Sequence, residues 1–163
     1  MKKLIYTLLI IIGLTNNSFS AGSGGDSDST PKTSDYAKAK NLINAAKKYE
    51  KKGKIDKAQK RYAKAQKLLL NSNEQKPLQA DTLNYLGFTT RKLGDYEGGE
   101  KFYLQGLQIE PNHNGINEYL GELYVATNRI DMAKERLEVL KTCNCEEYDE
   151  LKEIIEGTKK SKY

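Results

Sequence analysis

The sequence predicts an all-α fold, an α-solenoid of about three helix pairs closed by a C-terminal capping helix. Its 163 residues include 3 prolines and 30% charged residues, a composition typical of a well-solvated helical domain. A pattern of large and small side chains repeats at a fixed spacing along the chain. Within each copy, apolar residues recur at helical spacing and are followed by turn residues.

The repeat is clearest between two copies in the middle and second half of the chain. Leu83–Gly87 corresponds to Asn117–Gly121 at a shift of 34 residues, and the same shift takes Gly99 to Ala133. A degenerate first copy matches the second at a shift of 41 residues, and the seven extra residues are assigned to a longer connection at Asn71–Pro77. The copies lie near residues 39–72, 80–113 and 114–145.

Glycines occupy helical positions of the second copy where alanine would favour the helix more. Gly87, Gly99 and Gly106 each weaken a helix by up to about 1 kcal/mol relative to alanine. A missing side chain lets two helix backbones approach closely, and Tyr103 is expected to fill the space beside them. We therefore expect the two helices of this copy to pair tightly.

The motif residues of the second copy are Leu83, Leu86-Gly87, Gly94-Asp95-Tyr96, Tyr103 and Pro111, and those of the third are Leu120-Gly121, Tyr124, Ala133 and Leu137. This pattern resembles the tetratricopeptide repeat (TPR) family over about residues 35–145. It departs from the family at Gly99 and Gly106, where alanine is usual, and at Thr90, where tyrosine is usual. The resemblance implies a peptide-binding scaffold in which the first helix of each pair lines a concave groove. A generic helical bundle is the alternative.

The C-terminal part of the chain supplies a closing helix for the array, over residues 146–158. Tyr148, Leu151, Ile154 and Ile155 share one face of it, and acidic residues crowd its first turn, where the helix dipole favours them. The predicted helical domain therefore spans residues 35–158. The remaining residues, 159–163, form a basic tail with three lysines, which is expected to fray.

The N-terminus has the pattern of an export signal. Two lysines precede the apolar run Leu4–Leu14, which makes about 16 Å of helix and is too short for a hydrocarbon core. Small residues follow, and cleavage is predicted after Ser20, so residues 1–20 form the signal peptide and 21–34 a flexible Gly/Ser/Asp linker. These features predict a periplasmic or secreted protein with no stable membrane span after cleavage. An uncleaved anchor is the alternative.

The predicted function is recognition of a protein or peptide partner in the groove. A helix projection also places Lys40, Ile43, Lys51 and Asp81 near it, and packing against neighbouring helices is an equal alternative for Tyr85 and Phe88. Mixed charges and aromatic rings suit an extended peptide. The groove residues are Lys47, Asn84, Tyr85, Phe88, Arg91, Lys92, Glu118, Tyr119 and Glu122.

Charge and motif content limit the other functions. Removal of the two signal lysines lowers the net charge from +5 to +3, which gives no reason to expect a nucleic-acid partner. Some family members clamp the terminal carboxylate of heat-shock chaperones, but of the corresponding positions here only Lys47 can contact a carboxylate. Self-association into a homo-oligomer is compatible with so small an array. A purely structural role in envelope assembly is a further alternative.

Cys143-Asn144-Cys145 is the one reactive element that the sequence offers. A disulfide, two packed thiols, or a Cu(I) or thiol-redox site are the alternatives, and the last would make the chain a periplasmic copper-handling or redox protein. The single histidine, His113, is expected in a turn, with Asn112 and Asn114 as candidate N-caps. No nucleophile with a base beside it is found, so neither an enzyme nor a cofactor is expected.

Overall fold

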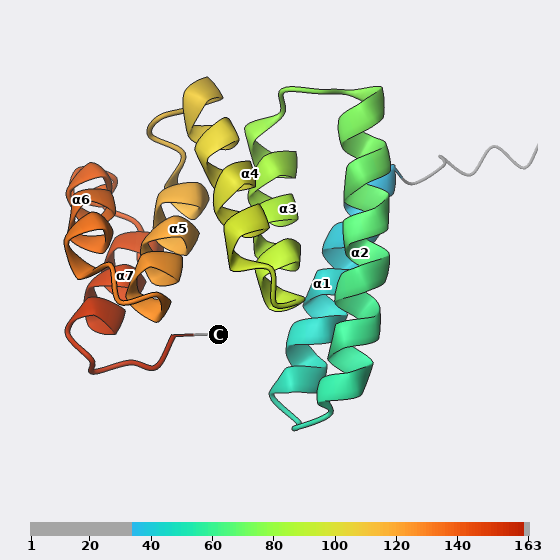
Figure 1. Ribbon diagram of the computed structural model, residues 1–163, viewed down its shortest axis with the longest axis horizontal. Helices are drawn as coiled ribbons and strands as arrows, with labels where there is room; N and C mark the ends of the chain where they lie inside the picture. Colours follow the sequence, from blue (N-terminus) through green and yellow to red (C-terminus); the bar gives the residue numbers. More distant parts are fainter. Residues whose placement is uncertain (1–33, 162–163) are drawn as a thin grey trace, which may run out of the picture. The chain divides into compact units, whose positions relative to one another are not determined.

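The computed structural model describes residues 34–161, which form seven α-helices and no strand (Figure 1). The first helix of each pair contacts the second, so α1 packs on α2, α3 on α4 and α5 on α6, while α7 packs on α5 and α6. The predicted all-α solenoid of three helix pairs with a capping helix is confirmed. The helices are α1 (Asp35–Glu50), α2 (Ile55–Gln75), α3 (Ala80–Lys92), α4 (Tyr96–Ile109), α5 (Asn114–Ala126), α6 (Ile130–Leu140) and α7 (Glu146–Ile155).

Several predictions concern residues that lie outside the described part of the chain. The signal peptide, nearly all of the linker, and the last two residues of the basic tail belong to this group. Among the described helices, none has the length and apolar character needed to cross a membrane.

Side chains cap three of the helices at their N-termini. Ser34 Oγ accepts a hydrogen bond from the Ala37 amide at 3.2 Å, and Asp95 Oδ1 accepts one from the Gly98 amide at 2.8 Å. At α5 the cap is His113, whose Nδ1 accepts from the Ile116 amide at 3.2 Å. The expectation of an asparagine cap at this position was therefore wrong, because the imidazole nitrogen serves as the acceptor.

The connection between the first two pairs differs from the prediction. The structure extends α2 through Gln75, so most of the seven extra residues add helical turns instead of lengthening a loop. Residues 71–76 include no glycine or proline, and the first proline after them is Pro77. Without a residue that disfavours the helix, α2 continues until that proline restricts the backbone.

The close approach expected within the second copy is confirmed. A methyl group added at Gly87 of α3 would lie 2.5–2.8 Å from three ring atoms of Tyr103 in α4, and the Tyr103 side chain is fully buried. The backbone of α3 thus lies directly against the tyrosine ring. This contact joins the two helices of the central pair, and buried apolar side chains continue the core into the neighbouring pairs.

Buried tyrosines give the fold a predicted sensitivity to high pH. Burial raises the pKa of Tyr103, Tyr62 and Tyr119 above the ordinary value of 10.0, and Glu50 and Glu118 raise those of Tyr62 and Tyr119 further. Because the folded state holds these protons more tightly, its stability is complete below pH 10 and falls as the pH rises above that value. Each such proton contributes a slope of at most about 1.4 kcal/mol per pH unit.

We expect a titration followed at 295 nm, together with circular dichroism, to reveal the buried tyrosines. Tyr62, Tyr103 and Tyr119 should ionise only together with the loss of helical circular dichroism. Ionisation of every tyrosine with intact helices would contradict this.

Candidate functional site

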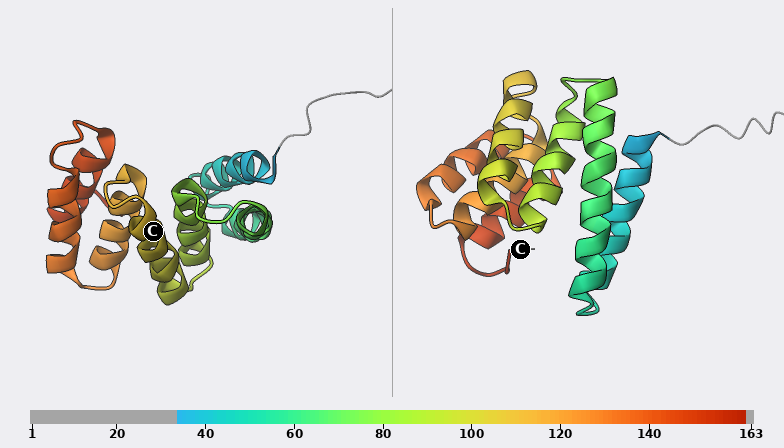
Figure 2. Two further views of the ribbon diagram at one scale, coloured as in Figure 1. Left: turned by 90° about the horizontal axis from the view of Figure 1, so that it is seen from above. Right: turned by 45° about the vertical axis from the view of Figure 1, so that its right-hand side comes forward.

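The first helices of successive pairs form a continuous face, which we call the inner face. Contacts run from α1 to α3, from α3 to α5 and from α5 to α7, so α7 takes the place of the first helix in a fourth pair. Figure 2 shows the successive pairs from two further directions. All nine side chains predicted to line a groove come from α1, α3 and α5. The structure therefore allows their mutual contacts to be described directly.

Aromatic rings lie at the centre of the inner face. Phe88 is 1% exposed and packs against Tyr62 and Tyr119 with ring centroids 5.7 and 5.2 Å apart. Tyr85 is half-buried and packs against Tyr36 in a T-shaped arrangement with ring centroids 5.9 Å apart. For Phe88 the structure shows the packing alternative, whereas Tyr85 stays partly exposed.

A lysine from α1 lies over these rings. The ammonium of Lys47 is 4.6 Å from the centroid of Phe88, and it donates a hydrogen bond to Tyr119 Oη at 3.3 Å. An ammonium above aromatic faces is attracted by their quadrupole. Lys47, Phe88 and Tyr119 thus form one basic–aromatic group that joins three first helices.

Arg91 of α3 connects this group to an acidic region on α5. Its guanidinium donates to the Tyr119 carbonyl at 2.8 Å and pairs with Glu122 at 3.4 Å, and both charged side chains are fully buried. Its neighbour Lys92 pairs with Glu50 at 2.7 Å. Helical periodicity placed Arg91, Lys92 and Glu122 on one face. It indicated neither the ion pairs of Arg91 and Lys92 nor the burial of Arg91, because the paired residues are far apart along the chain.

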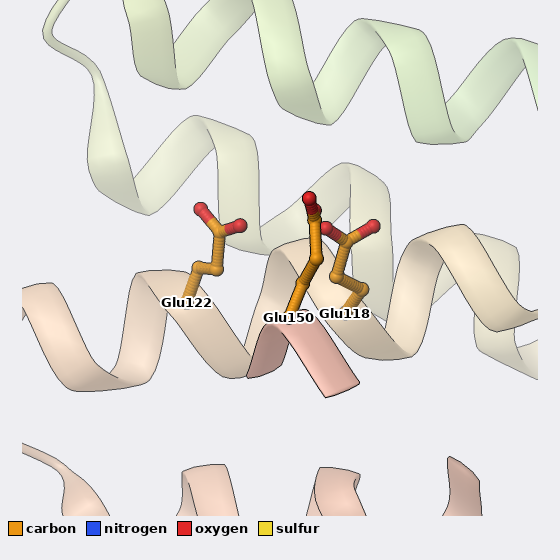
Figure 3. A group of neighbouring side chains, drawn as sticks. All are labelled: Glu118, Glu122 and Glu150. Atoms are coloured by element: carbon orange, nitrogen blue, oxygen red, sulfur yellow. The ribbon is translucent and has the colours of Figure 1, made fainter. Parts of the chain in front are cut away.

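Three glutamates form the acidic region, which we call the glutamate cluster. Glu118 and Glu122 come from α5 and Glu150 comes from α7, with one carboxylate oxygen of each within 4.8 Å of the others. Their carboxylates point to the same side, as Figure 3 shows. Glu118 and Glu122 are buried and Glu150 is half-buried. Carboxylates this close repel one another, so the cluster favours cationic groups.

The other predicted residues have varied positions. Asn84 is 6% exposed beside Gly115, and its Oδ1 has no hydrogen-bond partner in the described part of the chain. Ile43 was wrongly placed in the groove, since it is 1% exposed and belongs to the core between α1 and α2.

Lys40 is exposed and lies near the rings of Tyr36 and Tyr85. Lys51 is the exposed C-cap of α1, and Asp81 contacts His113 Nε2 at 3.3 Å.

The two cysteines are joined by a disulfide between α6 and α7. Among residues 34–161, the group of His, Cys, Asp or Glu side chains close enough to hold a metal is the glutamate cluster, which contains neither cysteine. His113 lies at the start of α5, where it caps the helix. Of the alternatives considered for Cys143 and Cys145, namely a disulfide, packed thiols and a Cu(I) or redox site, the structure contains the disulfide.

Sequence reasoning missed the contribution of the C-terminal region to the inner face. Glu150 was given no role in the sequence analysis, because α7 was treated as a cap and only its apolar face was projected. Lys159, expected to fray, pairs with Glu150 at 3.1 Å and Glu153 at 3.5 Å. Treating α7 as the first helix of an incomplete fourth copy would have placed Glu150 beside Glu118 and Glu122.

Comparison with known proteins shows the fold. No family model matches the sequence, and no curated protein matches it. Among solved structures, the type III secretion translocator chaperone SycD of Yersinia enterocolitica is 18% identical, with a TM-score of 0.51 over 84% of this chain and 91% of that one. The first TPR domain of human RPAP3 is 21% identical, with a TM-score of 0.48 over 74% of this chain and 91% of that one. The chain has a TPR-like fold.

Proposed function

We propose that this chain is an exported scaffold that binds a protein or peptide along its inner face. The observation that carries the proposal is the group of basic and aromatic side chains there that keep accessible atoms, Lys47, Tyr85 and Tyr119, beside the half-buried carboxylate of Glu150. Partly exposed aromatic rings and charges gathered on one face are typical of surfaces that bind proteins or peptides.

The distribution of charge on the inner face indicates which charges the partner should carry. Lys47 and Arg91 accompany the aromatic rings between α1 and α3, and the glutamate cluster lies between α5 and α7. An extended peptide laid across the first helices would meet a basic–aromatic region and then an acidic one. The proposed partner therefore carries both signs of charge. SycD, which shares the fold, is itself named a translocator chaperone.

Export is proposed from the sequence alone. Two lysines, a short apolar run and small residues before Ala21 support a cleaved signal. An intact mass that corresponds to a chain beginning at Ala21, for protein recovered from outside the cytoplasm, tests this part.

Partner capture tests the proposed face. We expect the double substitution Lys47→Ala and Tyr85→Ala to lower capture by the full chain at least about tenfold, equivalent to about 1.4 kcal/mol. Both side chains are half-buried and keep accessible atoms. Phe88 and Arg91 are less suitable targets because they are fully buried and their removal would also disturb the fold. The measurement is quantitative mass spectrometry of proteins retained by the immobilised chain.

A matched control uses the same residue types elsewhere. Lys67 is exposed on α2 and Tyr96 is 40% exposed on α4, so Lys67→Ala with Tyr96→Ala should leave capture unchanged. Equal capture by the inner-face variant, the control variant and the parent would overturn the proposal. If only the double Cys143→Ser and Cys145→Ser variant lost function, the thiol alternative would replace it.

A further inference from the structure

The first helix pair carries most of the positive charge of the described part of the chain. Residues 34–76, which include α1 and α2, contain 13 lysines and arginines and 4 aspartates and glutamates, a net charge of +9. Residues 77–161 contain 10 basic and 16 acidic residues, a net charge of −6. Charge asymmetry of this kind steers charged partners by long-range attraction. An acidic partner is therefore drawn to the first pair.

This basic pair also has an apolar groove, which we call the α1–α2 groove. Two adjoining depressions of about 400 and 630 Å³ form it, and both are lined by Leu42 of α1 and Lys64 of α2. Leu68 and Leu70 continue the apolar lining along α2, and Leu70 is 43% exposed. Figure 1 shows α1 and α2 at one end of the array, where α3 is the one other described helix that packs against them. Terminal repeats of such arrays usually present a polar outer face, so an apolar groove at this end indicates a binding surface.

Basic side chains of α2 border the groove. Lys60, Lys64 and Lys67 are exposed, and Arg61 is half-buried beside them. The three lysines recur at spacings of four and three residues, so they follow one face of the helix. Within residues 34–161 they form no ion pair. Their ammonium groups are therefore available to the carboxylates of a partner.

The length and lining of the groove suit a helix. Its lining residues run along α2 from Lys60 to Glu74, about 21 Å at a rise of 1.5 Å per residue, which is about four helical turns. A helix with apolar residues at i, i+3, i+4 and i+7 would place them against the leucines of the groove. Acidic residues beside that stripe would then face the lysines. Glu74 is the one acidic residue of this lining and lies at its far end.

We propose that the α1–α2 groove binds an acidic amphipathic helix of another protein. The partner's apolar stripe lies on Leu42, Leu68 and Leu70, and its carboxylates pair with the lysines that border the groove. The groove shares no residue with the groove predicted on the inner face, so this inference does not rest on the function proposed for that face.

Two other occupants fit the groove less well. A surface that enters an anionic bilayer needs protruding apolar side chains, and Leu70 is the one large apolar residue of this lining that is more than a third exposed. A second copy of the chain would have to offer its own acidic helix, α7. That helix buries Leu151 and Ile154 within its own array, so its apolar stripe is already covered.

Fluorescence anisotropy of the full chain with a labelled peptide tests the proposal. The probe is a peptide of about 16 residues, constrained as a helix by a lactam bridge, with a leucine stripe flanked by glutamates. A second probe has glutamine in place of each glutamate. At low ionic strength we expect the acidic probe to bind at least about tenfold more tightly than the glutamine probe. Lys64→Glu with Lys67→Glu should lower the affinity for the acidic probe at least about tenfold, and Leu70→Gln about threefold.

A matched control makes the same charge change outside the groove. Lys48 and Lys52 are exposed on the same basic pair and do not line the groove, so Lys48→Glu with Lys52→Glu should change the affinity less than about twofold. Equal losses in the two charge-reversal variants, or equal binding of the two probes, would overturn the proposal.

Further measurements separate the other binding sites and occupants. The inner-face variant, Lys47→Ala with Tyr85→Ala, should bind the acidic probe as the parent does. Loss of binding in that variant alone would place the probe on the inner face, which would overturn the groove proposal and leave the proposed function standing. Binding to phosphatidylglycerol–phosphatidylcholine vesicles that is tighter than to the probe, and that is lost with Lys64→Glu and Lys67→Glu, would assign the groove to an anionic bilayer instead. Self-association in sedimentation velocity that the same two substitutions abolish would assign it to a second copy.

Discussion

Gly87→Ala is expected to lower the free energy of unfolding by about 2 kcal/mol, although alanine is the better helix former. The added methyl group would lie 2.5–2.8 Å from three atoms of the Tyr103 ring, which is fully buried. Overpacking of this kind costs about 1–3 kcal/mol, and the upper end applies because three ring atoms are affected. The better helix propensity of alanine offsets about 1 kcal/mol of this cost, so the net loss is about 2 kcal/mol. Urea unfolding followed by circular dichroism measures the change.

A second glycine provides the comparison for this prediction. A methyl group at Gly121 would meet the end of the Leu151 side chain, at 2.5 Å from Cδ2, and not a rigid ring. A leucine terminus can change rotamer, so Gly121→Ala should cost less than Gly87→Ala. In the double variant Gly87→Ala with Tyr103→Leu, the two changes should cost less together than the sum of the single changes. Equal losses for the two glycine variants, or strict additivity, would contradict the role assigned to the ring.

The repeat pattern made the pairing of helices predictable. Small residues at Gly87 and Gly121, large ones such as Tyr103, and turn residues between them recur with the period of a helix pair, so local sequence carries the information. The end of α2 was less predictable. Helix length there depends on where a helix-disfavouring residue first appears, and comparison with the other copies suggested a loop.

The inner face was predictable as a set of residues but not as a set of contacts. Helical periodicity places Arg91 and Glu122 on first helices, yet their pairing depends on how α3 and α5 pack. The burial of Phe88 likewise depends on Tyr62 and Tyr119, which come from two other helices. The hydrogen bond that Ser161 donates to Glu122 joins residues 39 positions apart and leaves no periodic signal in the sequence.

Arg91→Ala is expected to cost about 3–5 kcal/mol, the range observed when one partner of a buried ion pair is removed. The substitution deletes the pair with Glu122 and the hydrogen bond to the Tyr119 carbonyl, and it removes a cation from beside the glutamate cluster. The remaining carboxylates then repel one another in a largely buried site. Arg91→Lys should show an intermediate loss, because it keeps the charge but not the planar fork of donors.

The pH dependence of this loss separates an electrostatic cause from a packing defect. In Arg91→Ala the clustered glutamates bind protons more tightly when folded than when unfolded, so stability lost at pH 8 should be partly regained toward the ordinary glutamate value near 4.3. Arg129→Ala is the control, because its pair with Glu100 is 34% and 19% exposed and should be worth at most about 1 kcal/mol. If Arg91→Ala cost no more than Arg129→Ala, or cost the same at pH 8 and pH 4.5, the Arg91–Glu122 pair would not be what holds α3 to α5.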